Sequence, residues 1–221
     1  MRYRYQLMLL GFALFIVAAL HRGWTVPVVW LGGDFVALGI AHWTSSHRVL
    51  GKRDDGTISP WAWVVFLPYL IVTVSIWHIL RLLTAEPAFN PVTDDLVIGR
   101  RLLSAEIPAG FENYIDLTAE FPEAPAIRRS SAYFCFPILD GSAPTPQALH
   151  AAVSALRPGR TFIHCAQGHG RTGLFALAIL LSRGAVGSVQ DGLSILRLAR
   201  PGVHLNRSQL SCIEAYAKRS T

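Results

Sequence analysis

The sequence predicts an α/β domain that follows an α-helical membrane region of two to three hydrophobic helices. Hydrophobic residues make up 52% of the 221 and charged residues only 15%, whereas soluble domains carry about 25% charged residues. Mean hydropathy is +0.37. After residue 86 short apolar runs alternate with helical patterns, which is typical of a layered α/β domain. We therefore expect a membrane-anchoring helical region at 1–85 and a water-soluble domain at 86–221.

Three apolar stretches, 6–20, 24–43 and 61–80, form the predicted membrane region. About 20 helical residues span the hydrocarbon core of a bilayer. The last two stretches are long enough, and the first is marginal unless Tyr3 and Tyr5 extend it. A cleaved signal peptide is the alternative for the first stretch, but a second apolar run begins almost at once.

The side of the membrane that holds the soluble domain depends on the third stretch. Three full spans that keep the basic residues at 2, 4, 48, 52 and 53 inside would place the domain outside. Two spans, with the third stretch in the interface, keep those residues, Arg81 and the domain inside. Pro68 and the tryptophans near both ends of this stretch are compatible with a bent interfacial or re-entrant helix as well as with a span. We favour a multi-pass protein with a cytoplasmic domain, in which Asp34 faces the helix bundle and has a polar partner there.

The net charge of +6 does not indicate a nucleic-acid partner, because the basic residues form no cluster with interleaved aromatics. The three cysteines, Cys135, Cys165 and Cys212, are an odd and widely spaced set without a CxxC pair. Neither a disulfide framework nor a zinc knuckle is indicated. A reducing compartment suits such a set.

In the soluble part, apolar runs closed by Gly, Pro or charged residues predict strands, and helical spacing predicts helices. The predicted strands are 96–99, 114–117, 132–136 and 161–164. The predicted helices are 146–156, 172–183, 188–199 and 207–218.

The segment HCAQGHGRTG, residues 164–173, lies between a buried strand and an apolar helix. A loop in this position directs backbone N–H groups and the positive end of a helix dipole at one point, which favours a bound phosphate. The same field favours the thiolate of Cys165, Arg171 offers a planar fork for two phosphate oxygens, and Thr172 can donate its hydroxyl to the sulfur. The expected phosphate-binding residues are Ala166, Gln167, Gly168, His169, Gly170 and Arg171.

Three other interpretations of this segment are weaker. A metal site built from His164, Cys165 and His169 lacks a fourth ligand and the usual spacing. A nucleotide-binding P-loop would need a GKS or GKT sequence. A buried structural cysteine beside a helix start does not explain the full arrangement.

At these residues the sequence resembles the dual-specificity branch of the cysteine-dependent protein tyrosine phosphatases, whose motif is HC-x5-R-[ST]. The resemblance covers residues 92–218 and implies a dual-specificity-phosphatase-like domain, with a central sheet flanked by helices. It implies that Cys165 attacks phosphorus, Arg171 clamps the phosphoryl group, Asp140 protonates the leaving oxygen and His164 orients the cysteine backbone. Asp140 could instead only form a turn with Gly141, and Asp116 and Glu120 are the reserve acids. By the same resemblance, residues 200–210 pack the final helix.

The resemblance and the apolar region together predict a membrane-tethered phosphatase that acts through a cysteinyl-phosphate and needs no cofactor or metal. A tethered domain meets lipid head groups at high effective concentration, so membrane lipids are the expected partners and a lipid phosphomonoester the first substrate. Residues 117–123 are loosely similar to the Glu-rich motif of mitochondrial phosphatidylglycerophosphate phosphatases. A highly phosphorylated inositol is disfavoured, because Ala166, Gln167 and His169 stand where lysines would be needed. A phosphoprotein substrate is the alternative, and an inactive phosphate-binding adaptor is the remote one.

Overall fold

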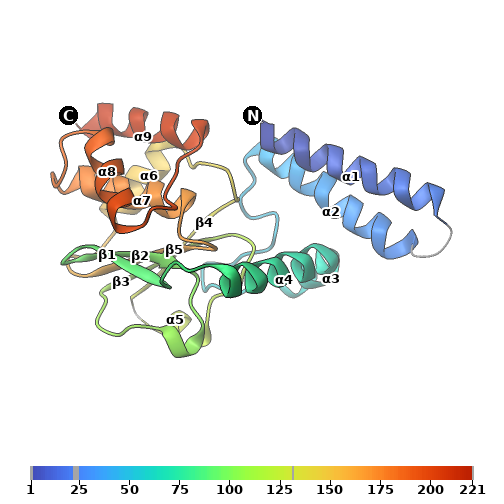
Figure 1. Ribbon diagram of the computed structural model, residues 1–221, viewed down its shortest axis with the longest axis horizontal. Helices are drawn as coiled ribbons and strands as arrows, with labels where there is room; N and C mark the ends of the chain where they lie inside the picture. The colour runs from blue at the N-terminus through green and yellow to red at the C-terminus, as the bar shows by residue number, and fades with distance from the viewer. Residues whose placement is uncertain (1, 22–24, 131, 221) are drawn as a thin grey trace. The chain divides into compact units, whose positions relative to one another are not determined.

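The computed structural model describes residues 2–21, 25–130 and 132–220 (Figure 1). The chain divides into two compact units. A helical unit comprises 1–53, 57–84 and 119–122, and an α/β unit comprises 54–56, 85–118 and 123–221. Residues 54–56 thus belong to the α/β unit although helical-unit residues precede and follow them in the sequence, and residues 119–122 belong to the helical unit although α/β residues precede and follow them.

The helical unit contains α1 (Arg2–Leu20), α2 (Thr25–Thr44), α3 (Pro60–Val65) and α4 (Leu67–Leu83). Helices α1 and α2 lie side by side, and a Cβ atom on Gly11 would be only 2.7 Å from the carbonyl oxygen of Gly32. Such close backbone contact through small residues is typical of helices packed within a membrane. Of the described helices, α2 alone has both the length and the apolarity to cross a membrane, whereas α1 and α4 are apolar but shorter. Trp24, where the second stretch was predicted to begin, lies outside the described residues.

The third apolar stretch was predicted as one helix, but the structure divides it at Phe66, with Pro68 in the first turn of α4. Proline lacks an N–H group and is tolerated at a helix start. Asp34 of α2 is 3% exposed, and its Oδ2 accepts a hydrogen bond from the Tyr69 amide at 3.2 Å. The carboxylate of Asp34 therefore accepts from one of the amides in the first turn of α4, where a helix leaves its N–H groups without intrahelical acceptors.

Residues 119–122 pack within the helical unit. The Phe121 ring contacts Trp77, with ring centroids 6.0 Å apart. The Phe121 carbonyl accepts a hydrogen bond from Nζ of Lys52, a side chain that is itself buried. This contact gives the buried lysine a polar partner.

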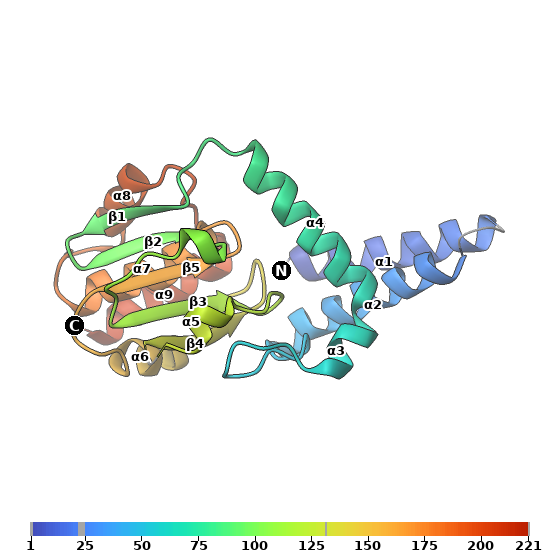
Figure 2. The same cartoon turned by 90° about the horizontal axis from the view of Figure 1, so that it is seen from below.

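The α/β unit is built on a five-stranded mixed sheet in the order β1-β2-β5-β3-β4 (Figure 2). β1 (Phe89–Thr93) is antiparallel to β2 (Leu96–Arg100), and the remaining pairs are parallel. The other strands are β3 (Asn113–Thr118), β4 (Tyr133–Ile138) and β5 (Thr161–Cys165). The four predicted strands lie within two residues of their expected bounds. Strand β1 was not predicted, because Pro91 obscures its pattern, and it forms an edge of the sheet, where proline is tolerated.

Helices α6 (Pro146–Ser154), α7 (Gly170–Ser182), α8 (Val189–Ala199) and α9 (Arg207–Ser220) cover one face of this sheet (Figure 1). The opposite face carries the short α5 (Pro125–Arg128), and a 3₁₀ turn, η1 (Ser104–Glu106), follows β2. Residues 171–180 of α7 are all buried, because this helix packs between the sheet and its neighbouring helices. Helix α7 begins two residues earlier than predicted, so Arg171 and Thr172 belong to its first turn.

Candidate active site

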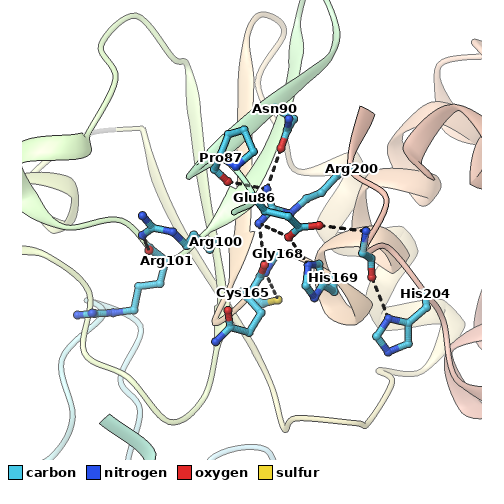
Figure 3. A network of polar contacts seen from close by, with 12 residues as sticks. Glu86, Pro87, Asn90, Arg100, Arg101, Cys165, Gly168, His169, Arg200 and His204 are labelled. Carbon is cyan, nitrogen blue, oxygen red and sulfur yellow. Dashed lines mark hydrogen bonds and ion pairs between the residues drawn. The ribbon is translucent and has the colours of Figure 1, made fainter. Parts of the chain in front are cut away.

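The loop between β5 and α7 begins at Cys165 and ends where Gly170 starts the helix. The Cys165 side chain is buried, and its Sγ accepts a hydrogen bond from the Gly168 amide at 3.2 Å (Figure 3). The loop therefore directs a backbone donor at the sulfur, as the sequence pattern led us to expect of a phosphate-binding loop.

Gly168 adopts a φ of +78° and packs on the backbone of β2. A Cβ atom at this position would lie 2.5 Å from both the carbonyl carbon and the oxygen of Gly99. Because backbone atoms cannot move aside as a flexible side chain can, glycine is required here.

We expect Gly168→Ala to lower kcat/KM for a phosphate ester by about 10- to 100-fold, since a strained left-handed residue costs about 1–3 kcal/mol and the clash would also turn the amide away from Cys165. Gly184→Ala is the matched control, because Gly184 also has a positive φ, +66°, but a Cβ atom added there would meet no neighbouring atom within 4 Å. Steady-state kinetics of both variants would test this. Equal activity of the two variants would show that the loop tolerates a side chain at 168.

The pKa of Cys165 lies below its ordinary value. Burial alone would raise this pKa, but the positive charge of Arg171 and the hydroxyl and amide of Thr172 outweigh burial. The negative charge of Asp140 acts in the opposite direction and raises it. The thiolate is the nucleophilic form of cysteine, so these surroundings favour the reactive form of the sulfur at a lower pH than in an ordinary thiol.

Arg171 is 2% exposed and extends from the first turn of α7 to the carboxyl end of β4. Its Nη1 donates to the Ile138 carbonyl at 2.9 Å, and its Nη2 lies 3.2 Å from Oδ1 of Asp140. The guanidinium group is therefore held in a fixed orientation between the sulfur and the loop that carries Asp140.

Asp140 has a side chain that is 62% exposed, although it is paired with Arg171. Its loop is held from α9 and the segment before it: Asn206 Nδ2 donates to the Gly141 carbonyl at 2.8 Å, and Gln209 Nε2 donates to the Ser142 carbonyl at 3.2 Å. The structure thus brings Cys165, Arg171 and Asp140 into electrostatic contact with one another.

The two reserve acids lie in different surroundings. Asp116 is fully buried, and it accepts hydrogen bonds from the Thr118 amide at 2.8 Å and the Tyr133 hydroxyl at 3.0 Å. Glu120 is 5% exposed and accepts from the Ala119 amide at 3.0 Å. Of the three carboxylates, Asp140 is the one whose side chain is largely open to solvent.

His164 is buried behind the nucleophile, and its Nε2 lies 2.8 Å from Oε2 of Glu123. Burial alone would lower the pKa of His164, but the negative charges of Glu123, Asp116 and Cys165 outweigh it and raise this pKa. The ion pair therefore fixes the imidazole next to Cys165. Sequence reasoning did not find Glu123, because 41 residues separate the two partners.

Among the residues that the structure describes, Asp116, Glu123 and His164 form one group with ligand-type atoms within 4.8 Å of one another. Within this group Nε2 of His164 lies 2.8 Å from Oε2 of Glu123, and Asp116 accepts hydrogen bonds from the Thr118 and Tyr133 hydroxyls. This arrangement is explained by a hydrogen-bonded support for the loop.

Comparisons with known proteins connect this geometry to a fold. No protein-family profile matches the sequence, and no curated protein is significantly similar to it. A solved structure, Tk-PTP in the active form, is 21% identical over 60% of this chain and 98% of its own, with a TM-score of 0.51. The human tyrosine phosphatase-like serine/threonine/tyrosine-interacting protein is 14% identical over 59% of this chain and 96% of its own, with a TM-score of 0.52. The chain therefore contains the α/β fold of the dual-specificity and tyrosine-phosphatase-like proteins.

Proposed function

We propose that this chain is a membrane-tethered, cysteine-dependent phosphatase that hydrolyses phosphate monoesters. The observation that carries the proposal is the surroundings of Cys165: a buried sulfur with a lowered pKa, a backbone donor from Gly168 and a fixed guanidinium from Arg171. A structural cysteine would need none of these, whereas a nucleophile that attacks a dianionic phosphate needs all three.

In the first step, the Cys165 thiolate forms a bond to phosphorus while the bond from phosphorus to the ester oxygen breaks. The departing oxygen takes a proton from the Asp140 carboxyl group. Arg171 and the loop amides hold the equatorial oxygens, where negative charge is concentrated. The products are a cysteinyl-phosphate and the free alcohol.

In the second step, water attacks the cysteinyl-phosphate and the sulfur leaves as a thiolate. The Asp140 carboxylate, which lost its proton in the first step, accepts one from the attacking water. Inorganic phosphate is released, and Cys165 and Asp140 return to their starting protonation states. The His164–Glu123 ion pair holds the base of the loop through both steps.

We infer that the substrate is a lipid phosphomonoester. The apolar helix α2 supports attachment to a bilayer, and a tethered domain meets lipid head groups at high effective concentration. The loop side chains at 166, 167 and 169 include no lysine, so the site offers few additional charges for a head group with several phosphates.

The function is tested with the full chain purified in detergent. Hydrolysis of a chromogenic phosphate ester is measured with and without a chelator, followed by a panel of lipid monoesters and phosphopeptides. We expect hydrolysis that the chelator does not abolish, and a higher kcat/KM for a lipid monoester than for any phosphopeptide. A preference for phosphopeptides would make the protein-phosphatase alternative correct, and binding of phosphate without hydrolysis would make the chain an adaptor.

The topology proposal rests on residues 54–56, which belong to the α/β unit. The Gly56 carbonyl accepts a hydrogen bond from the Glu123 amide at 2.9 Å, and a Cβ atom on Gly56 would lie 2.4 Å from the Tyr133 hydroxyl. Because residues 54–56 lie in the loop that joins α2 to α3, we propose that this loop is on the same side of the bilayer as the α/β unit. This supports two spans, α1 and α2, with the divided third stretch not crossing.

We expect cysteines introduced at Ser46 and Lys218, in a variant without the three native cysteines, to resist an impermeant thiol reagent in intact cells. Both positions are exposed. A cysteine at His21, at the end of α1, should be labelled because two spans place it outside, and it serves as the control. Labelling at 218 with protection at 46 would contradict the proposal and indicate three spans.

A further inference from the structure

Glu86 lies at the point where the chain enters the α/β unit, two residues after Thr84 ends the helical unit's second segment. Its Oε2 lies 2.6 Å from Nε2 of His169 and 3.1 Å from Nη2 of Arg200 (Figure 3). Its Oε1 accepts a hydrogen bond from the Gly202 amide at 3.1 Å. The carboxylate thus joins three residues that come from the phosphate loop and from the segment after α8.

Arg200 extends this cluster to the backbone of the phosphate loop. Its side chain is 1% exposed, and its Nη2 donates to the Gln167 carbonyl at 3.0 Å. Its Nη1 donates to the Pro87 carbonyl at 2.9 Å and to Oδ1 of Asn90 at 2.7 Å. One buried guanidinium therefore connects the entering chain to the loop, and Glu86 supplies its negative partner.

The Gln167 carbonyl belongs to the same peptide group as the Gly168 amide. A peptide group is planar, and its C=O and N–H point in opposite directions. The hydrogen bond from Arg200 to the Gln167 carbonyl therefore also fixes the direction of the Gly168 N–H. That N–H is the one that donates to Sγ of Cys165 at 3.2 Å. The orientation of a donor at the nucleophile therefore depends on the position of Arg200.

We propose that Glu86 is a positioning residue for the phosphate loop, acting through Arg200 and His169. The proposal rests on the proposed phosphatase function, because the loop is the part that would bind the phosphoryl group. Without the carboxylate, His169 loses its partner and Arg200 loses the negative charge that balances it. The 167–168 peptide is then free to rotate, and the loop no longer keeps its amides directed at one point.

The experiment uses the full chain in detergent and measures two quantities: the dissociation constant of orthovanadate, an oxyanion that probes the loop, and kcat/KM for a chromogenic ester. In Glu86→Gln, removal of a negative charge near the loop would by electrostatics alone tighten oxyanion binding. If the phosphate loop is no longer positioned, oxyanion binding should instead become weaker. We expect about tenfold weaker vanadate binding and a similar loss in kcat/KM, the size of one hydrogen bond to a charged group.

Gly202→Ala tests the same cluster without a change of charge. A Cβ atom at 202 would lie 2.3 Å from Nε2 of His169 and 2.7 Å from Oε1 of Glu86. These are ends of side chains, which can move, so the fold is retained while the contacts are broken. We expect weaker vanadate binding here as well. Glu112→Gln is the control. Glu112 accepts a hydrogen bond from the Arg160 amide, which lies just before β5, whereas the phosphate loop follows β5.

The outcomes separate this inference from the proposed function. Thermal melting of each variant establishes that it is folded. If the unaltered chain neither binds vanadate nor hydrolyses the ester, the proposed function fails. If the unaltered chain does both, and Glu86→Gln and Gly202→Ala match it or bind vanadate more tightly, Glu86 does not position the loop.

Discussion

Cys165→Ser is expected to abolish turnover while orthovanadate binding stays within about threefold of the unaltered chain. The loss of rate should be about 10⁴-fold or more, by comparison with removal of a catalytic nucleophile in other hydrolases. A serine hydroxyl has a pKa far above 7 and is not ionised in this loop. The Gly168 amide and the Arg171 guanidinium, which we propose bind the oxyanion, remain in place. Steady-state kinetics and a vanadate titration measure both effects.

Cys135→Ser is the matched control, because Cys135 also carries a thiol that is in no disulfide but lies on β4, outside the loop. It should keep nearly full activity. The pH dependence of alkylation adds a separate test. Since the pKa of Cys165 is lowered, its reaction with iodoacetamide should stay fast below the ordinary thiol pKa and slow only as pH falls through the lowered value. Retention of a tenth of the activity in Cys165→Ser would exclude Cys165 as nucleophile.

The loop itself could be predicted from the sequence because its chemistry is local. Cys165, Gly168 and Arg171 lie within seven residues, and the buried strand before them and the apolar helix after them have clear patterns. Asp140 was predicted only through the family resemblance, since nothing in its own sequence neighbourhood indicates a partner in α7.

The residues that support the loop could not be found in this way. Glu86 meets His169 across 83 positions in the sequence, and Arg200 meets the Gln167 carbonyl across 33. Periodicity describes one element at a time and carries no information on such pairs. The same reason explains the division of the third apolar stretch at Phe66, where the start of α4 is stabilised by Asp34 from α2.

Composition, by contrast, indicated the apolar stretches but not the break within the third of them. Hydropathy measures how much apolar surface a stretch carries, while the end of a helix depends on where backbone donors and acceptors find other partners. In the third stretch that partner comes from another helix, so the sequence of the stretch alone could not locate the break.

Asp140→Asn is expected to slow hydrolysis of esters with poor leaving groups by about 10²-fold or more, the usual contribution of a general acid. A lipid alkoxide is such a leaving group, because it must be protonated as it departs. An aryl phosphate with an acidic phenol departs as a stable anion, so it should slow much less. The structure makes this variant informative: asparagine has nearly the same shape, and Asn206 still holds the loop at the Gly141 carbonyl.

The measurement is the dependence of kcat/KM on leaving-group pKa, across a series of aryl and alkyl phosphates, for the unaltered chain and Asp140→Asn. If Asp140 donates the proton, the unaltered chain depends weakly on leaving-group pKa and the variant depends steeply. Asp191→Asn, which removes an exposed carboxylate on α8, should leave the dependence unchanged.

Loss of the Asp140 charge also removes an influence that raises the pKa of Cys165, so the thiolate of Asp140→Asn should persist to lower pH. Equal slowing of every ester would mean that Asp140 only holds Arg171 in place, because a displaced guanidinium weakens phosphate binding whatever the leaving group.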